Sequence, residues 1–244
     1  MATSVSRRHI EITPELMLRA YRAGLFPMAE ARGSARLYWL DPEMRGVLPL
    51  DGFHLPRRLA RTVLSDEFEV RCDSDFAGTI ALCATPAPGR DETWINTEIE
   101  ALFTALHRQG HAHSIEVRAG GALVGGLYGV TIGGVFFGES MFSRARDASK
   151  VALVHLVARL RLMGFSLLDT QFTTNHLAQF GTVDIPRAVY KARLALAVEL
   201  PVVWDPEPEG LRQAIVALRS PAEHVAGAPV PGGDSSAPGP SDNR

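Results

Sequence analysis

The chain has 244 residues, of which 46% are hydrophobic and 21% charged, a balance typical of a globular protein with one large core or two smaller ones. Its formal net charge of -2 and isoelectric point of about 6.4 exclude a protein that binds nucleic acid through an overall positive charge. Because the first residues lack the apolar run of a signal peptide and no stretch is apolar enough for a membrane helix, we expect a cytoplasmic protein without a membrane partner.

A first helix is predicted between Thr13, which is suited to the N-cap, and Gly24, which is suited to end the helix. Pro14 fits the first helical position. Residues 25–46 contain glycine, proline and aromatic side chains without a regular period, which favours an irregular functional loop or a small lobe. We therefore predict a small N-terminal domain over residues 1–52.

Regular elements follow from residue 53 onwards. The pattern predicts a short helix over 55–62, a strand over 68–73, and helices over 77–84 and 98–109. Thr97 and Glu100 have the spacing of a capping box for the last of these helices, and Gly110 is placed to end it.

A β-meander is predicted from three segments rich in valine, isoleucine and aromatic residues, at 113–119, 122–130 and 133–140. Paired glycines at 120–121 and 133–134 suit its turns. A long helix over 148–163, a strand over 166–171 and a helix over 187–200 complete a predicted domain of residues 53–220. Proline, glycine and serine dominate residues 221–244, which we expect to be a disordered tail.

The expected fold class is α+β, a mainly antiparallel sheet flanked by helices. The element order is similar to the GNAT acyltransferase layout, in which a long helix follows a meander and the next strand diverges to open a cleft. This similarity concerns the order of elements alone.

Glu139 is the most unusual residue of the meander, because its carboxylate arrives at the end of a strongly apolar strand. A charge in such a place needs a partner or a chemical task. The alternative is a glutamate that points into solvent or caps the next element.

Asp169 and Gln171 alternate with apolar and small residues in the predicted strand 166–171. The two-residue period of a strand places both side chains on one face, where the amide of Gln171 can donate to Asp169 and accept from an incoming donor. A hydrogen-bonded pair at a strand end without any catalytic task is the alternative.

Other candidate residues are apolar or basic. Loop tryptophans and large apolar residues near the polar positions suit either a core or a substrate pocket: Trp39, Trp94, Leu127, Phe136, Met141, Leu153, Leu156 and Leu168. Arginines and a lysine cluster on the short helix and before the long one, where they suit either solvent or phosphate: Arg57, Arg58, Arg61, Arg144 and Lys150.

Several chemistries are not indicated by any motif. The sequence has no phosphate-binding P-loop, no HExxH zinc motif, no GxSxG elbow and no dinucleotide fingerprint. His111 and His113 lack a nearby third ligand, so we expect no metal site and no cofactor.

Taken in order, nine short motifs resemble those of the leucyl/phenylalanyl-tRNA–protein transferase family over about residues 14–200: GLFPMAE, YWLDP, TWI, GHAHSIEV, LVGGLYGV, FFGESMFSR, ASK, LLDTQ and IPR. The resemblance implies a GNAT-like domain that moves Leu, Phe or Met from aminoacyl-tRNA to the N-terminal Arg or Lys of a protein. Such a product is marked for N-degron proteolysis.

The resemblance also implies roles for individual residues. Asp169 and Gln171 match the catalytic Asp and the relay Gln, and Glu139 matches a strand-end Glu that orients the acceptor. The apolar residues above match an amino-acid pocket and the two tryptophans the surroundings of the terminal adenosine. From the chemistry we expect backbone amides near Ser140 to stabilise the oxyanion.

Two rival interpretations stay open from the sequence. A CoA-dependent N-acetyltransferase would share the element order, but its glycine-rich pyrophosphate turn is absent from SRARDASK before the long helix. A non-catalytic module that binds tRNA or peptide would tolerate loss of Asp169 and Gln171. No apolar helix face is left unassigned, so we expect a monomer.

Overall fold

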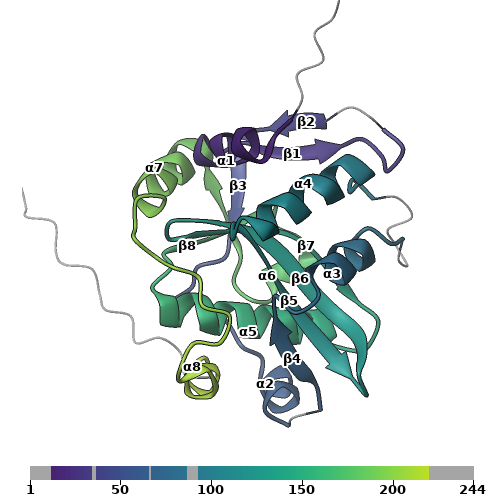
Figure 1. The fold of residues 1–244 in the computed structure, drawn as a ribbon. Helices are drawn as coiled ribbons and strands as arrows, with labels where there is room; N and C mark the ends of the chain where they lie inside the picture. Colours follow the sequence, from purple (N-terminus) through teal and green to yellow (C-terminus); the bar gives the residue numbers. More distant parts are fainter. Residues whose placement is uncertain (1–11, 35–36, 66, 87–92, 220–244) are drawn as a thin grey trace, which may run out of the picture.

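The computed structural model describes residues 12–34, 37–65, 67–86 and 93–219 (Figure 1). Its centre is a seven-stranded sheet in the order β4-β5-β6-β7-β8-β3-β9. All neighbouring strands in it are antiparallel except β7 and β8, so the predicted α+β class with a mainly antiparallel sheet is confirmed. The strands of this sheet are β3 (Met44–Val47), β4 (Glu69–Cys72), β5 (Ala112–Ala119), β6 (Ala122–Ile132), β7 (Val135–Ser143), β8 (Leu167–Gln171) and β9 (Val183–Pro186).

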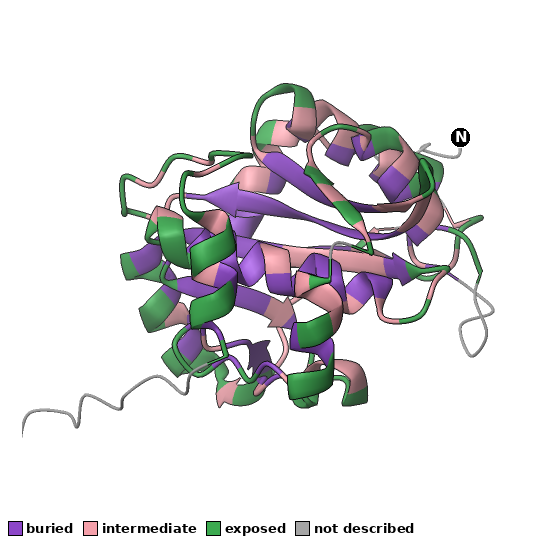
Figure 2. Ribbon diagram, turned by 90° about the horizontal axis from the view of Figure 1, so that it is seen from below, coloured by how far each residue is buried: buried purple, intermediate pink, exposed green. Residues whose placement is uncertain are grey.

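Helices cover both faces of the sheet and enclose a core on each side, with the buried strands between them (Figure 2). The first core includes side chains of α1 (Pro14–Arg22), α3 (Phe76–Cys83), α4 (Thr97–Arg108) and α7 (Arg187–Ala197). The second includes side chains of α2 (Arg57–Leu64), α5 (Ala148–Met163) and α8 (Leu211–Ala217). Strand alternation divides neighbouring residues between the cores.

The meander and the long helix are confirmed by β5, β6, β7 and α5. Gly120 and Gly121 turn the first hairpin with φ of 56° and 82°, and Gly133 turns the second with φ of 54°. The long helix has the predicted bounds, and Gly164 follows it with φ of 80°.

The prediction of an irregular stretch over residues 25–46 was wrong. The segment contains a two-stranded hairpin of β1 (Phe26–Ala29) and β2 (Leu37–Leu40), followed by β3 in the main sheet. Each strand is only four residues long, too short for alternation to be recognised. The division between residues 52 and 53 stays a prediction, and the proposed tail at 221–244 lies outside the described residues.

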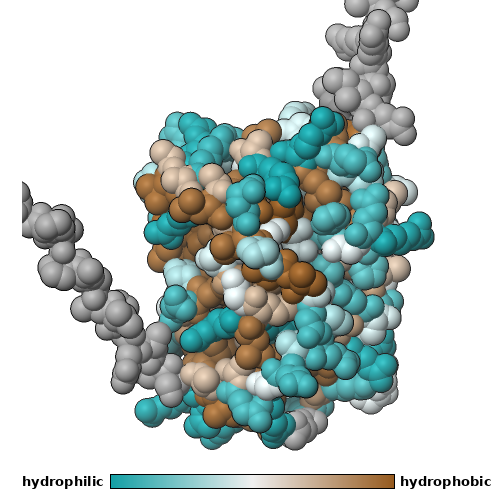
Figure 3. Space-filling view, turned by 60° about the vertical axis from the view of Figure 1, so that its left-hand side comes forward, coloured by the Kyte–Doolittle hydropathy of each residue, from teal (hydrophilic) through white to brown (hydrophobic). Residues whose placement is uncertain are grey.

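The segment after α7 leads back across the molecule to α8, near the C-terminal end of the described chain. On the face that comes forward in Figure 3, apolar side chains are interspersed with polar ones. Among the described residues, no helix combines the length and apolar character that crossing a membrane would require.

The N-cap of α4 differs from the predicted capping box. The side chain of Asn96 accepts the backbone N–H of Ile99 at 2.8 Å, and its amide donates to the carbonyl of Ser34 at 2.7 Å. Thr97 is the exposed first residue of the helix. Asparagine is at least as favourable as threonine at the N-cap of a helix. Asn96, directly before Thr97, has the extended backbone of a cap residue.

Replacing Asn96 with alanine should therefore destabilise the protein by about 1–2 kcal/mol, because α4 loses its cap and the loop at Ser34 loses an anchor. Thr97→Ala, the matched control, should change the free energy of unfolding by less than about 0.5 kcal/mol. Urea unfolding followed by circular dichroism measures both. Equal losses in the two variants would contradict the assignment of the cap.

Candidate active site

A cavity opens where β7 and β8 part. The two strands pair in parallel from Val135 with Leu167 to Phe137 with Asp169, and beyond this point residues of both strands face a cavity of about 590 Å³. Hydrogen-bonded sheet would otherwise fill this space. The divergence of the only parallel pair in the described sheet thus creates a site between two strand ends.

The floor of the cavity is apolar and comes from the core on the α5 side. Leu127 and Met141 face each other across β6 and β7, and Leu153 and Leu156 of α5 lie beneath them. Leu168 of β8 completes this floor. Side chains of β1, the end of α3 and Trp94 line the opposite wall. A mainly apolar slot of this size suits one apolar side chain of a substrate.

Glu139 lies at a β-bulge of β7. Gly138 pairs with Gly129 and Ser140 with Tyr128, so that Glu139 has no opposite residue of its own on β6. A Cβ atom on Gly129 would come within 2.3 Å of the Phe137 carbonyl oxygen, which shows how closely the two strands approach here. The strand continues to Ser143, and the bulge, not a strand end as expected, turns the carboxyl toward the cavity.

The carboxyl of Glu139 has two hydrogen-bond donors. Its Oε1 accepts the Tyr21 hydroxyl at 2.8 Å and the side-chain amide of Gln171 at 3.3 Å. Burial, together with the nearby charge of Asp169, raises the pKa of Glu139 to about 8, although the Tyr21 hydroxyl and the charge of Arg45 act in the opposite direction. The group is thus poised to exchange a proton near neutral pH.

Asp169 is completely buried and does not line the cavity. It forms a two-pronged ion pair with Arg45, with Nε to Oδ1 at 2.9 Å and Nη2 to Oδ2 at 2.7 Å. The Tyr190 hydroxyl donates to Oδ2 at 2.7 Å. Burial disfavours the charged form of Arg45 and acts to lower the pKa of its guanidinium. The hydrogen bonds to Asp169 and the charge of Asp169 outweigh burial, so that the pKa is raised.

Gln171 lines the cavity, whereas Asp169 lies behind it. Its side chain donates to Glu139, and its backbone N–H donates to Oδ1 of Asp169 at 2.8 Å. The expectation that both side chains share one face of the strand was wrong. Gln171 has a φ of 56°, a left-handed conformation that ends the regular alternation of β8.

The other predicted pocket residues divide into two groups. Trp39 lies in β2 and packs against the first core, and Phe136 is fully buried in the second core. Neither of them lines the cavity. The remaining predicted residues do line it: Trp94, Leu127, Ser140, Met141, Leu153, Leu156 and Leu168.

The predicted basic residues occupy two places. Arg57 and Arg61 of α2 line an open hollow together with Arg219, and Arg58 is exposed beside them. Arg144 lies at the rim of the main cavity. Lys150 is paired with Asp147 at 3.1 Å, at the start of α5. Two separate surfaces could therefore contact phosphates.

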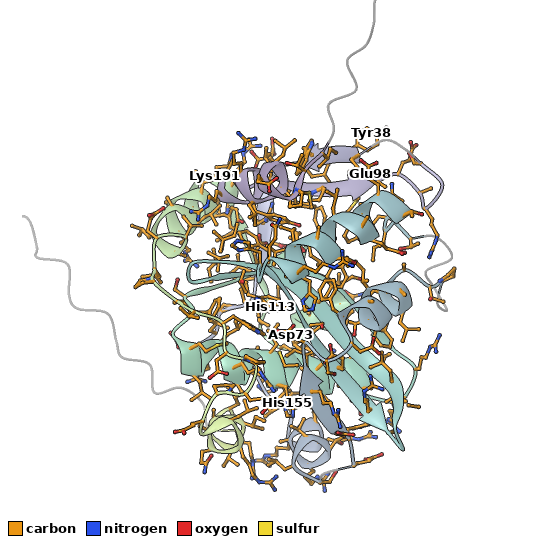
Figure 4. The ribbon with its side chains drawn as sticks, viewed as in Figure 1. Tyr38, Asp73, Glu98, His113, His155 and Lys191 are labelled. Atoms are coloured by element: carbon orange, nitrogen blue, oxygen red, sulfur yellow. The ribbon has the colours of Figure 1, made fainter. Side chains whose placement is uncertain are left out.

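The core includes or contacts His113, Cys72 and Cys83. His113 is buried and bonds Asp73 through Nδ1 at 2.8 Å, and the two side chains lie close together in Figure 4. Burial raises the pKa of the Cys72 thiol, and Cys83 is fully buried. No group of three or more potential metal ligands occurs among the described residues.

Three side chains that connect the two carboxyl groups to the core are not indicated by any sequence pattern: Tyr21, Arg45 and Tyr190. Tyr21 and Tyr190 looked like ordinary core positions of their helices, and both are buried. Arg45 lies in the stretch 25–46, for which the sequence pattern predicts no regular element. The only signal available was a charged residue directly before the apolar segment of residues 46–50, which is too common to be selective.

Two family models match the chain. The model described as leucyl/phenylalanyl-tRNA protein transferase matches residues 47–195, and the one described as the N-terminal domain of the same transferase matches residues 11–43. Together they cover every residue of the cavity discussed above.

Curated relatives carry the same description, leucyl/phenylalanyl-tRNA–protein transferase. The chain is 55% identical to that of Rhodopseudomonas palustris strain HaA2 over 206 residues, which are 84% of this chain and 92% of the relative. It is 56% identical to that of Gluconobacter oxydans over 87% of this chain and 95% of the relative. It is 59% identical to that of Nitrobacter winogradskyi over 78% and 84% of the two chains.

The raised pKa of Glu139 should make the folded protein lose stability as pH rises from about 4.5, the ordinary value, to about 8, the folded value. In that interval the folded state binds more protons than the unfolded state, so the free energy of unfolding falls with pH. Glu139→Gln removes the titrating carboxyl group and should therefore weaken the dependence of the free energy of unfolding on pH. Urea unfolding of the wild type and the variant at about pH 5 and pH 8.5 measures this dependence. An equal change in the free energy of unfolding between the two pH values in both proteins would contradict the raised pKa.

Proposed function

Because the chain belongs to the leucyl/phenylalanyl-tRNA–protein transferase family, we propose that it transfers Leu, Phe or Met from aminoacyl-tRNA to the N-terminal Arg or Lys of acceptor proteins. The transfer marks the acceptor for N-degron proteolysis. One observation carries the assignment of the site: the Glu139 carboxyl, with a pKa of about 8, faces a cavity whose floor is apolar.

The apolar floor is proposed to hold the side chain of the transferred amino acid. Leu, Met and Phe are unbranched at Cβ and can extend into a slot lined by flexible leucine and methionine groups. Ile and Val carry a second substituent at Cβ, close to the reacting carbonyl. We propose that this difference in shape excludes them.

The reaction joins two bound substrates without further activation. The α-amino nitrogen of the acceptor attacks the ester carbonyl carbon, and the resulting tetrahedral carbon then releases the ribose oxygen of the tRNA. The amine proton passes to that departing oxygen. Since the ester is already activated, positioning of the two substrates supplies a large part of the rate, and no ATP is consumed.

Glu139 and Gln171 are proposed to act on the amine directly. An α-amino group has a pKa of about 8, so a carboxyl with a similar pKa can take its proton and return it to the ribose oxygen. The carbonyl of Gln171 can accept a second N–H of the amine. Asp169 supports Gln171 from behind, and Ser140 lies on β7 where its backbone can face the oxyanion.

The basic residues are proposed to contact the tRNA. Arg144 is at the cavity rim, near the expected position of the terminal nucleotides, and Trp94 offers an aromatic face there. Arg57, Arg58 and Arg61 on α2 would contact phosphates farther from the terminus. Lys150 would join them by exchanging its bond with Asp147 for a phosphate. Trp39 would contribute indirectly, through the packing of the β1–β2 hairpin against the first core.

An acetyl-CoA site at the start of α5 is disfavoured by charge. Asp147 occupies the N-cap of this helix with a φ of 63°, where the pyrophosphate of CoA would have to bind. A carboxylate at this N-cap weakens the attraction that the N-terminus of a helix otherwise has for a pyrophosphate.

A cytoplasmic monomer is the simplest form of this enzyme. Charged tRNA and newly exposed protein N-termini meet in the cytoplasm. Apolar and polar side chains intermingle on the face in Figure 3, which favours a monomer.

The proposal is tested by supplying Leu-tRNA and a peptide that begins with Arg, and by measuring the addition of one Leu by mass spectrometry. Glu139→Gln should lower the turnover rate by about 10²–10⁴-fold, because the amide cannot accept the proton. Gln171→Ala should lower it as well.

Glu98→Gln is the matched control for charge, because Glu98 lies on α4 at the top of Figure 4, outside the cavity lining. Its turnover should equal that of the wild type. A wild type without product, or a Glu139→Gln variant with full turnover, would contradict the proposal.

For the tRNA surface, changing Arg57 and Arg61 together to Gln should raise the KM for Leu-tRNA about tenfold at moderate salt and leave turnover unchanged. The salt dependence should also weaken, by about one unit in the slope of log KM against log salt for each lost phosphate contact. Steady-state kinetics at several salt concentrations measure both effects.

Arg193→Gln on α7 is the control, since α7 and α2 lie at opposite ends of the molecule in Figure 1. If this variant raises the KM as much as the α2 variant, α2 is not the binding surface.

A further inference from the structure

We propose that Arg45 and Tyr190 are positioning residues of the transfer reaction, which together with Asp169 hold Gln171 in the conformation that aims its amide at Glu139. The inference rests on the proposed function for its kinetic consequences. It assigns a task to two residues outside the cavity, and it gives Asp169 a positioning task in place of the catalytic role that the family resemblance implies.

Arg45 is fixed on all sides. Its side chain is 1% exposed, and the guanidinium lies between the rings of Phe26 and Tyr190, 4.5 Å from each centroid. Nη1 donates to the carbonyl of Gly24 at 3.1 Å. Two aromatic faces and a backbone carbonyl leave the planar fork one orientation, in which its remaining donors meet Asp169.

Asp169 has no oxygen left for a substrate. Oδ1 accepts Nε of Arg45 at 2.9 Å and the backbone N–H of Gln171 at 2.8 Å. Oδ2 accepts Nη2 of Arg45 at 2.7 Å and the Tyr190 hydroxyl at 2.7 Å. Four donors occupy the two oxygens of a fully buried carboxylate, which is about the number it can accept. Its direct protonation by the amine would first require this arrangement to break.

Gln171 adopts a conformation that its own side chain disfavours. A φ of 56° is uncommon for glutamine and persists only where the surroundings fix it. Asp169 fixes one side through the Gln171 N–H. On the other side Gly46 of β3 lies opposite Gln171, and a Cβ on Gly46 would come within 2.6 Å of the backbone of Phe172. The turn is thus held between an ion pair and a strand.

The conformation decides where the amide points. Regular alternation would keep Gln171 on the face of Asp169, away from the cavity. With the left-handed turn, Nε2 lies 3.3 Å from Oε1 of Glu139 and the carbonyl is available to the amine. Tyr190 and Arg45 therefore influence the reaction indirectly, because they contact Asp169, which in turn holds Gln171.

Removing Arg45 or Asp169 alone would leave a buried charge and endanger folding, so the test removes one oxygen atom with Tyr190→Phe. We expect about a tenfold lower turnover rate with unchanged KM for Leu-tRNA and for the Arg peptide. The same change is then made in a Gln171→Gly protein, in which glycine keeps the left-handed backbone without the side chain. There, Tyr190→Phe should alter turnover by less than about twofold.

Tyr38→Phe is the matched control, because Tyr38 is 45% exposed on β2 at the top of Figure 4. It should leave turnover unchanged in both backgrounds. Equal tenfold losses with and without the Gln171 side chain would overturn the inference, because Asp169 would then act on the reaction directly.

Nuclear magnetic resonance of the ¹⁵N-labelled full chain supplies a readout that needs no substrate. Tyr190→Phe should shift the backbone N–H signal of Gln171 and broaden its side-chain amide signals, whereas Tyr38→Phe should leave them in place. Unchanged Gln171 signals in Tyr190→Phe would overturn the inference. A wild type that transfers no amino acid would instead overturn the proposed function, and the Gln171 signals would still decide the positioning.

Discussion

The buried ion pair between Arg45 and Asp169 is the constraint on which the site depends. It joins β3 to β8 at Asp169, the last residue of β8 that pairs with β7 before the two strands part. Buried pairs of this kind contribute little net stability, since the loss of hydration offsets the attraction. Their contribution is geometric: one arrangement of charges satisfies every donor, and it defines the end of β8.

Two carboxyl groups on adjacent strands acquire different chemistry from this arrangement. Asp169 is fully buried in contact with the Arg45 cation and accepts two further hydrogen bonds, from the Gln171 N–H and the Tyr190 hydroxyl. Glu139 faces the cavity with a phenol and an amide as donors and without a cation in contact, so burial and the charge of Asp169 favour its protonated form. The same functional group is thus a fixed anchor in one place and an exchangeable proton carrier in the other.

The sequence was informative wherever a pattern extended over many residues. The meander and α5 were predicted with nearly correct bounds, since alternation or helical period persisted for eight residues or more. Four-residue strands such as β1 and β2 gave no such signal. The apolar floor of the cavity also followed from the sequence through the family resemblance. The relation of Asp169 to Gln171 did not, because one left-handed residue reversed the face that alternation assigned, and the partners responsible for it are 124 and 21 residues away from Asp169 along the chain.

The position of β3 between β8 and β9 has a consequence for how the chain is made. The N-terminal hairpin and β3 leave the ribosome first, yet the strands that flank β3 come from residues 167–186 and the tyrosine that completes the ion pair from α7. Until these have been synthesised, Arg45 is a charge without its partner and β3 has no neighbouring strand in the sheet. Contacts of such long sequence separation form late and slowly. A nascent or truncated chain that ends before residue 190 therefore contains the described lining of the substrate cavity but lacks the Tyr190 hydroxyl that donates to Asp169, so the architecture that aims its reactive groups is incomplete until almost the whole folded region exists.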